Sequence, residues 1–259
     1  MNLIEKFLQS KKMERFRRFS GKTTGIYLKL KRFTPSTSEA LRTATIVNNL
    51  NIKYVLDVGA NTGQFAESLY DFGFKGTTIS FEPVSSCYKV LLKRSKKNSK
   101  LIVPERCAIG NEDKEVTINV TDDTVFSSIL KITDYHSKLK PKSRIVKTES
   151  VKMYRIDSII DNFIDPEEDS ILLKIDTQGF EKEVLEGAKN TIKRLKAIKI
   201  EIPLTNIYNN TQFTFYQTIE FLKDHNFIPY SFNIEGVNLK TGRVHTIDGL
   251  FVKDMTNRD

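Results

Sequence analysis

Four acidic residues of this chain lie at the ends of apolar runs that have the composition of buried strands. Asp57 lies in YVLDV, Glu82 follows TTISF, Asp176 follows ILLKI and Glu201 lies in IKIEI. Because neighbouring parallel strands end at the same edge of a sheet, we expect the four carboxylates to lie along one edge. Carboxylates gathered there could accept a proton, bind a cation or accept hydrogen bonds from hydroxyl groups.

The corner after the first of these runs reads DVGANTGQF, with Asp57, Gly59, Asn61 and Gly63 close together. Glycines between a strand and a helix let a ligand approach the backbone, and the N–H groups at the start of the helix favour an anionic group. The dinucleotide fingerprint G-x-G-x-x-G has a middle glycine that is missing here. Asp57 would also repel a phosphate. The corner therefore suits a ligand with an amine and a carboxylate better than a diphosphate.

S-adenosylmethionine has these features, because its methionine part is a zwitterion and its sulfonium is positively charged. Glu82 comes 19 residues after Gly63, at the end of the second strand. An acid in that position can accept hydrogen bonds from both ribose hydroxyls. We therefore predict that Asp57, Gly59, Asn61, Gly63 and Glu82 form a binding site for S-adenosylmethionine.

The elements that must position these residues alternate between strands and helices. Apolar residues recur at helical spacing after the strand at 54–58 and after the strand at 171–175. This alternation predicts an α/β fold with a doubly wound, Rossmann-like and mostly parallel sheet. We expect one strand over 102–109, added antiparallel strands at 116–120 and 146–154, and a C-terminal antiparallel hairpin formed by 227–232 and 249–252.

Several motifs together resemble the FkbM family of class I S-adenosylmethionine-dependent methyltransferases. They are DVGANTG, SFEPV, CAIGNEDKEV, VFSSI, LLKIDTQGFEKEVLEGA and GLFVK. The resemblance covers about residues 40 to 253. It implies the methyltransferase fold and cofactor, and it adds Ala60, Pro83 and Ala108 to the expected cofactor-binding residues. Gln178 departs from the family pattern, which usually has Glu there, and its amide can orient a hydroxyl by hydrogen bonding.

Methyl transfer to a hydroxyl needs a base at the carboxyl end of a central strand, because a hydroxyl is a poor nucleophile until its proton is removed. Asp176 and Glu201 are the leading candidates, and Glu181, at the start of the next helix, is a third. Two carboxylates in one cleft raise one pKa, as a general base requires. They could equally bind a metal ion, although we assign no metal ligand. The three histidines, His136, His225 and His245, are weaker candidates.

The N-terminal segment 1–39 is predicted to be a basic and helical arm preceding a methyltransferase domain at 40–259. Residues 1–35 hold ten Lys or Arg and two Glu, within a total net charge of +9. A basic surplus in an appendage, without a groove of interleaved aromatics, does not indicate nucleic-acid binding. Leu3, Ile4, Phe7 and Leu8 share a helix face, so the arm is a candidate for peripheral contact with the inner membrane leaflet or a glycolipid. A solvated or self-docked arm is the alternative.

The two cysteines, Cys87 and Cys107, form no CxxC or Cys/His cluster, and the N-terminus does not resemble a secretory signal. We therefore expect a cytoplasmic protein, and a homodimer remains open. As the resemblance implies, the predicted activity is O-methylation of a hydroxyl on a saccharide of a cell-surface polysaccharide or a glycolipid. The alternatives are a non-sugar acceptor, a cofactor-binding module without turnover in a glycan-assembly complex, and a nicotinamide-dependent oxidoreductase, which the glycine spacing disfavours.

Overall fold

In this computed structural model the described residues are 11–24, 33–130, 133, 141–205, 207 and 213–254. The chain divides into two compact units, Met1–Arg42 and Thr43–Asp259. The first unit contains helix α2 (Lys11–Thr24), which exposes Phe16 and Phe19. The apolar face that the sequence predicts near the N-terminus, at residues 3–8, lies outside the described residues. Among the helices that are described, none has the length and apolar character needed to cross a membrane.

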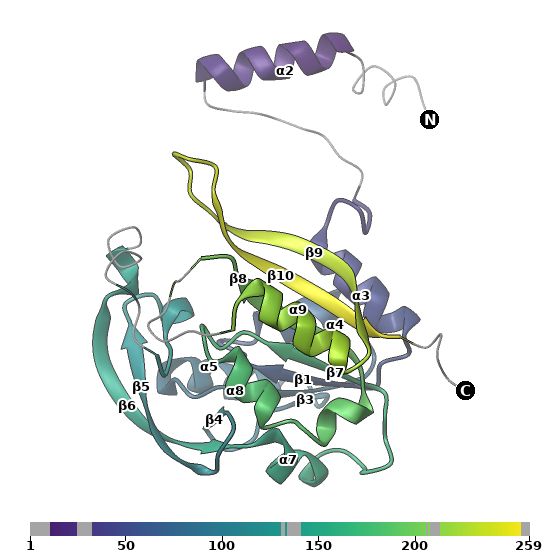
Figure 1. Cartoon of the computed structure of the whole chain (residues 1–259), viewed down its shortest axis with the longest axis vertical. Helices are drawn as coiled ribbons and strands as arrows, with labels where there is room; N and C mark the ends of the chain where they lie inside the picture. Colours follow the sequence, from purple (N-terminus) through teal and green to yellow (C-terminus); the bar gives the residue numbers. More distant parts are fainter. Residues whose placement is uncertain are drawn as a thin grey trace. The chain divides into compact units, whose positions relative to one another are not determined.

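The second unit is built on a seven-stranded sheet with the order β3-β2-β1-β7-β8-β10-β9 (Figure 1). Its strands are β1 (Tyr54–Val58), β2 (Thr77–Phe81), β3 (Leu101–Ile102), β7 (Ile171–Ile175), β8 (Leu195–Pro203), β9 (Phe227–Val237) and β10 (Val244–Lys253). The first five strands in this order are parallel, and β10 runs antiparallel to both β8 and β9. The predicted mostly parallel sheet with a C-terminal hairpin is confirmed, although both hairpin strands are longer than expected.

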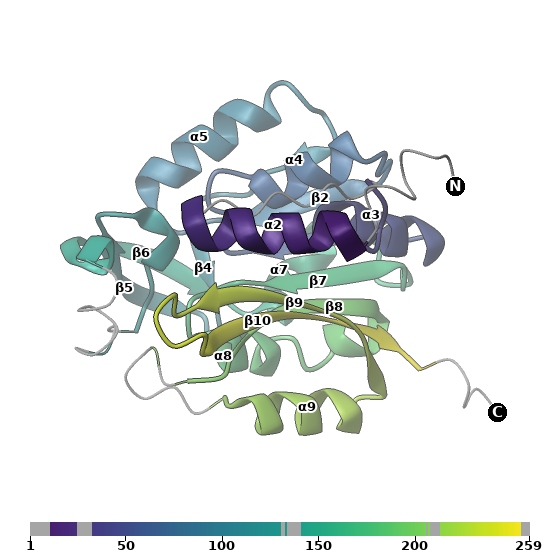
Figure 2. The same ribbon diagram turned by 90° about the horizontal axis from the view of Figure 1, so that it is seen from above.

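Helices cover both faces of this sheet (Figure 2). They are α3 (Glu39–Asn49), α4 (Gln64–Asp71), α5 (Ser85–Ser95), α7 (Ile156–Ile159), α8 (Glu181–Glu186) and α9 (Phe215–Asp224). Val55 of β1 and Leu172 of β7 pack with residues of α3 and α4 on one face. Their neighbours Leu56 and Leu173 face the other way and pack with residues of α8 and α9. Both faces of the central strands are therefore buried, as a parallel sheet requires.

A second sheet of three strands stands apart from the first, in the order β4-β6-β5. It contains β4 (Cys107–Ile109), β5 (Lys114–Thr121) and β6 (Ile145–Tyr154). The prediction of one strand over 102–109 is wrong, because β3 ends at Ile102 and β4 pairs with β6 in the second sheet. Pro104 lies between them and has no N–H group to donate to a strand ladder, which explains the break.

Candidate active site

The corner after β1 has the backbone geometry that its glycines allow. Gly59 and Gly63 have φ angles of 76° and 92°, in the left-handed region. A Cβ atom added at Gly59 would lie 1.9 Å from the carbonyl oxygen of Asp176. The end of β7 therefore comes against the corner so closely that only glycine fits at position 59. This contact brings Asp57 and Asp176 to the same edge of the sheet.

Glu82 braces the corner from the end of β2. Its Oε2 accepts a hydrogen bond from the Asn61 backbone N–H at 2.7 Å, and its Oε1 accepts one from Val84 N–H at 2.7 Å. Burial raises the pKa of Glu82 to about 7, against the lowering effect of these two N–H groups. A carboxylate oxygen can accept two hydrogen bonds, so each oxygen retains capacity for one more donor.

The start of α4 lies at this corner and has no side-chain cap. Its N-cap residue is Gly63, and no side chain accepts a hydrogen bond from the first turn as a cap. The positive end of a helix with uncapped N–H groups attracts a carboxylate. The remaining predicted cofactor-binding residues make contacts within the protein. Ala60 is buried against Ala66 of α4, Ala108 packs on β4 with Val84, and the Pro83 carbonyl accepts a hydrogen bond from Arg106.

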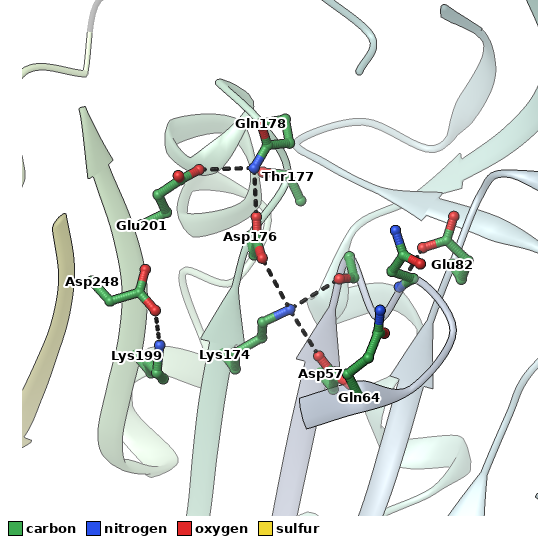
Figure 3. Close-up of polar contacts among 12 residues, drawn as sticks. Asp57, Gln64, Glu82, Lys174, Asp176, Thr177, Gln178, Lys199, Glu201 and Asp248 are labelled. Atoms are coloured by element: carbon green, nitrogen blue, oxygen red, sulfur yellow. Dashed lines mark hydrogen bonds and ion pairs between the residues drawn. The ribbon is translucent and has the colours of Figure 1, made fainter. Parts of the chain in front are cut away.

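A buried lysine that we did not predict, Lys174 of β7, lies in the centre of the site (Figure 3). Its Nζ is 3.1 Å from Oδ1 of Asp57 and 3.7 Å from Oδ2 of Asp176, and it donates to the Gly59 carbonyl at 2.9 Å. Burial opposes the charge on Lys174, but the two carboxylates outweigh it and raise its pKa. Asp57 is fully buried. Its charge is therefore balanced inside the protein, and Lys174 separates it from the more exposed Asp176.

Gln178 joins the two leading candidates for the catalytic base. Its Nε2 donates to Oδ1 of Asp176 at 2.8 Å and to Oε2 of Glu201 at 2.9 Å (Figure 3). The residue has a φ of 58°, and its carbonyl accepts a hydrogen bond from the Ser128 hydroxyl at 2.7 Å. Ser128 belongs to the VFSSI segment. This hydrogen bond ties the turn after β7 to the segment between β5 and β6. The Gln178 amide is directed at the carboxylates of Asp176 and Glu201.

The electrostatics of the pair favour a shared proton. Burial, and then the negative charges of Asp176 and Glu181, raise the pKa of Glu201 well above its usual range. Asp176 has the Lys174 ammonium beside it, while Glu201 has no such cation at its carboxylate in the described contacts. Since two close carboxylates resist double ionisation, a proton is held on the pair more readily than on an isolated glutamate.

Glu181, the third predicted catalytic acid, lies inside the turn. Its side chain is buried, and its Oε1 accepts hydrogen bonds from Thr177 N–H at 3.0 Å, the Thr177 hydroxyl at 3.1 Å and Gly179 N–H at 3.1 Å. These contacts hold the backbone that carries Asp176 and Gln178. Burial raises the pKa of Glu181 to about 7. The arrangement suits positioning of the turn.

This placement predicts how Glu181→Gln changes stability with pH. The folded state holds a proton on Glu181 that the unfolded chain releases at its ordinary pKa of 4.5, so folding binds protons between about pH 4.5 and 7. The parent should lose stability as the pH rises through this window, by about 3 kcal/mol from this group. The neutral amide should remove that loss. Urea unfolding at pH 5 and pH 8 measures it, and an equal destabilisation of the variant at both values would contradict the assignment.

The described histidines take no part in the cluster. The ring Nδ1 of His225, at the end of α9, is 2.8 Å from the Phe221 carbonyl oxygen. That of His245 is 3.0 Å from the Thr205 hydroxyl. His136 lies outside the described residues.

The missed residue, Lys174, had a signal in the sequence, because a lysine stands in the otherwise apolar run ILLKI. Lys199 in AIKIE is a second such case, and it pairs with Asp248 of β10.

Comparison with known proteins adds a family assignment to this geometry. The model of the methyltransferase FkbM domain matches residues 57–229. A search of curated proteins finds no match. Among solved structures, the methyltransferase FkbM from Methylobacillus flagellatus KT is similar at 14% identity and a TM-score of 0.45. That alignment covers 76% of this chain and 43% of that one, so the chain spans less than half of that protein.

Two further similar structures match nearly the whole chain. The magnesium protoporphyrin IX methyltransferase from Synechocystis PCC 6803, solved with bound S-adenosylmethionine, is 9% identical with a TM-score of 0.46 and coverages of 97% and 96%. A putative caffeoyl-CoA O-methyltransferase from Staphylococcus aureus is 8% identical with a TM-score of 0.45, covering 96% of each chain. The family match includes the corner after β1 and the turn after β7. The chain belongs to the FkbM methyltransferase family and is an S-adenosylmethionine-dependent methyltransferase.

Proposed function

We propose that the protein transfers a methyl group to a hydroxyl of a saccharide, in the biosynthesis of a cell-surface polysaccharide or glycolipid. The observation that carries this proposal is the pair formed by Asp176 and Glu201, joined by the Gln178 amide. A hydroxyl acceptor needs its proton removed during transfer, and a pair of carboxylates with one raised pKa supplies the base. Saccharides are the acceptors that the FkbM resemblance favours.

The described residues fit the cofactor. Both Glu82 oxygens retain hydrogen-bonding capacity for a pair of ribose hydroxyls, and the uncapped start of α4 suits a carboxylate. Asp57 is fully buried, where it contacts Lys174 and accepts a hydrogen bond from the Ser80 hydroxyl at 3.2 Å, so we assign it to positioning through Lys174. When bound, S-adenosylmethionine supplies an electrophilic methyl group. The Asp176 side chain is 44% exposed. Among the four carboxylates at the strand ends, it is therefore the one best placed to face the cofactor and the acceptor.

The proposed step uses the carboxylate pair as one unit. The pair formed by Asp176 and Glu201 would accept the proton of the acceptor hydroxyl, and S-adenosylmethionine, held at the corner after β1, would supply the methyl group to the acceptor oxygen. Gln178 holds the two carboxylates in place, and the Lys174 ammonium lies 3.7 Å from Oδ2 of Asp176. The products are a methyl ether, S-adenosylhomocysteine and one proton on the pair, which then passes to solvent.

The acceptor can be tested by mass spectrometry of the surface glycan from cells with and without this protein. We expect one sugar to be heavier by a single CH₂ group in cells that express the parent chain. Cells that express Asp176→Asn should give the unmodified sugar. Identical glycans in all strains, with a methylated non-sugar product in the cells that hold the parent, would overturn the saccharide assignment and leave the methyltransferase activity intact.

A further inference from the structure

A cavity lies at the end of β8, where the chain meets the start of α9. Its volume is about 390 Å³, and it is lined by residues 203–205 and 213–216. Binding sites for small molecules usually have volumes of roughly 300 to 1,000 Å³, so this cavity suits a ligand of small size. None of the residues that line it belongs to the cluster around Lys174 and Gln178.

The cavity is close to the carboxylate pair along the strand. Pro203 follows Glu201 by two positions in β8, so both side chains leave the same side of the strand. Two strand residues span about 7 Å. Glu201 itself points from β8 toward the Gln178 amide (Figure 3). A ligand that reaches from the cavity to Glu201 need therefore be little longer than one sugar ring.

Aromatic side chains form one wall of the cavity. Phe213 is buried and packs edge-on against Phe221 of α9, with ring centroids 5.9 Å apart. Phe215 and Tyr216 also meet edge-on at 5.6 Å. Tyr216 nevertheless remains 82% exposed. Packing against Phe221 thus fixes the Phe213 ring, whereas most of the Tyr216 side chain remains accessible to a ligand.

The two threonine hydroxyls of the lining already have partners inside the chain. The Thr205 hydroxyl contacts His245, and Thr214 forms the capping box of α9 with Gln217. Among the described residues that line the cavity, none carries a charged side chain. A ligand with a carboxylate or phosphate would lose its hydration without gaining a counter-charge, which is unfavourable. The lining therefore favours a neutral ligand with an apolar face.

We propose that this cavity binds the acceptor as a neutral hexose or 6-deoxyhexose ring, with the C–H face of the sugar stacked on Tyr216 and its edge against Phe215. The inference rests on the proposed function and specifies its substrate class. Aromatic rings contact such apolar faces through dispersion, while the sugar hydroxyls keep contact with water or with the carboxylate pair. Sugars that carry a carboxylate or a phosphate on the ring are excluded by the uncharged lining.

The test uses the full chain, tritiated S-adenosylmethionine and two sets of acceptors. One set contains methyl glycosides of neutral hexoses and 6-deoxyhexoses, and the other contains the corresponding hexuronates. We expect transfer to a neutral glycoside and at least about tenfold poorer kcat/KM for its hexuronate. Tyr216→Ala and Phe215→Ala should each raise KM for the neutral glycoside about tenfold, with kcat and the affinity for S-adenosylhomocysteine unchanged. Saturation-transfer NMR should show the ring C–H protons in contact with the parent.

The matched control is Tyr230→Ala, which removes an aromatic side chain that is 61% exposed on β9 and does not line the cavity. It should keep the parent KM. Transfer to a saccharide with parent KM values in Tyr216→Ala and Phe215→Ala, or equal use of hexuronates, would overturn the cavity assignment alone. If the parent methylates a non-sugar hydroxyl and no glycoside in either set, the proposed function itself fails.

Discussion

The Asp176→Asn variant is expected to lose about 10²- to 10⁴-fold in kcat, which is the usual contribution of a positioned base. Its affinity for S-adenosylhomocysteine should stay close to that of the parent, because the expected nucleoside contacts come from Glu82 and α4. The variant also removes a negative charge that raises the pKa of Glu201. The acidic limb of any residual pH–rate profile should therefore move to lower pH. Calorimetry and single-turnover kinetics measure the two quantities separately.

The matched control is Asp161→Asn, the same change at an aspartate that is 58% exposed and pairs with Arg194 away from the site. It should leave kcat within about twofold of the parent, since exposed ion pairs contribute little. Parent activity in Asp176→Asn would remove Asp176 from the mechanism. Loss of S-adenosylhomocysteine binding together with activity would instead assign Asp176 to the cofactor.

The Gly59→Ala variant should be the most destabilising substitution in the corner after β1. The new Cβ would overlap the Asp176 carbonyl oxygen at 1.9 Å, and both are fixed by the backbone of neighbouring strands. The φ of 76° adds the cost of a left-handed conformation. We expect a loss of about 3 kcal/mol or more in the free energy of unfolding, because neither strand can shift without breaking the ladder between them. Urea unfolding provides the measurement.

Gly73→Ala separates the two causes. Gly73 has a φ of 87°, but a Cβ atom there would meet nothing within 4 Å. It should therefore cost roughly 1 to 2 kcal/mol, from the backbone conformation alone. Equal losses in the two variants would show that the contact with Asp176 is not what requires glycine at position 59.

The parts of the fold that depend on local pattern were predictable. A five-residue apolar run such as ILLKI, followed by an acid and then by helical spacing, specifies a buried parallel strand and its carboxyl end. The same pattern predicted that Asp57, Glu82, Asp176 and Glu201 share one edge. The hydrophobic pattern was a weaker guide to short strands. The run over 102–109, predicted as one strand, is divided between β3 in the first sheet and β4 in the second.

The contacts inside the site depend on packing between distant segments, which one sequence does not reveal. Gly187, for example, follows the six residues of α8 at a point where a Cβ would lie 1.9 Å from the Gly110 carbonyl oxygen, so a contact across 77 positions requires glycine there. Likewise, spacing alone did not show that Lys174 lies between Asp57 and Asp176. A lysine in a buried strand indicates a partner but does not identify it. Gln178 was noticed only as a departure from a pattern, and its bridging role required the positive φ of the turn.

The most direct test of the account is calorimetric titration of the parent chain with S-adenosylhomocysteine and, separately, with NADH. If the corner after β1 accepts a zwitterionic amino acid joined to a nucleoside, S-adenosylhomocysteine should bind at a single site and NADH should give no heat of binding. Saturable binding of NADH, with no heat of binding for S-adenosylhomocysteine, would contradict the assignment of the corner to S-adenosylmethionine.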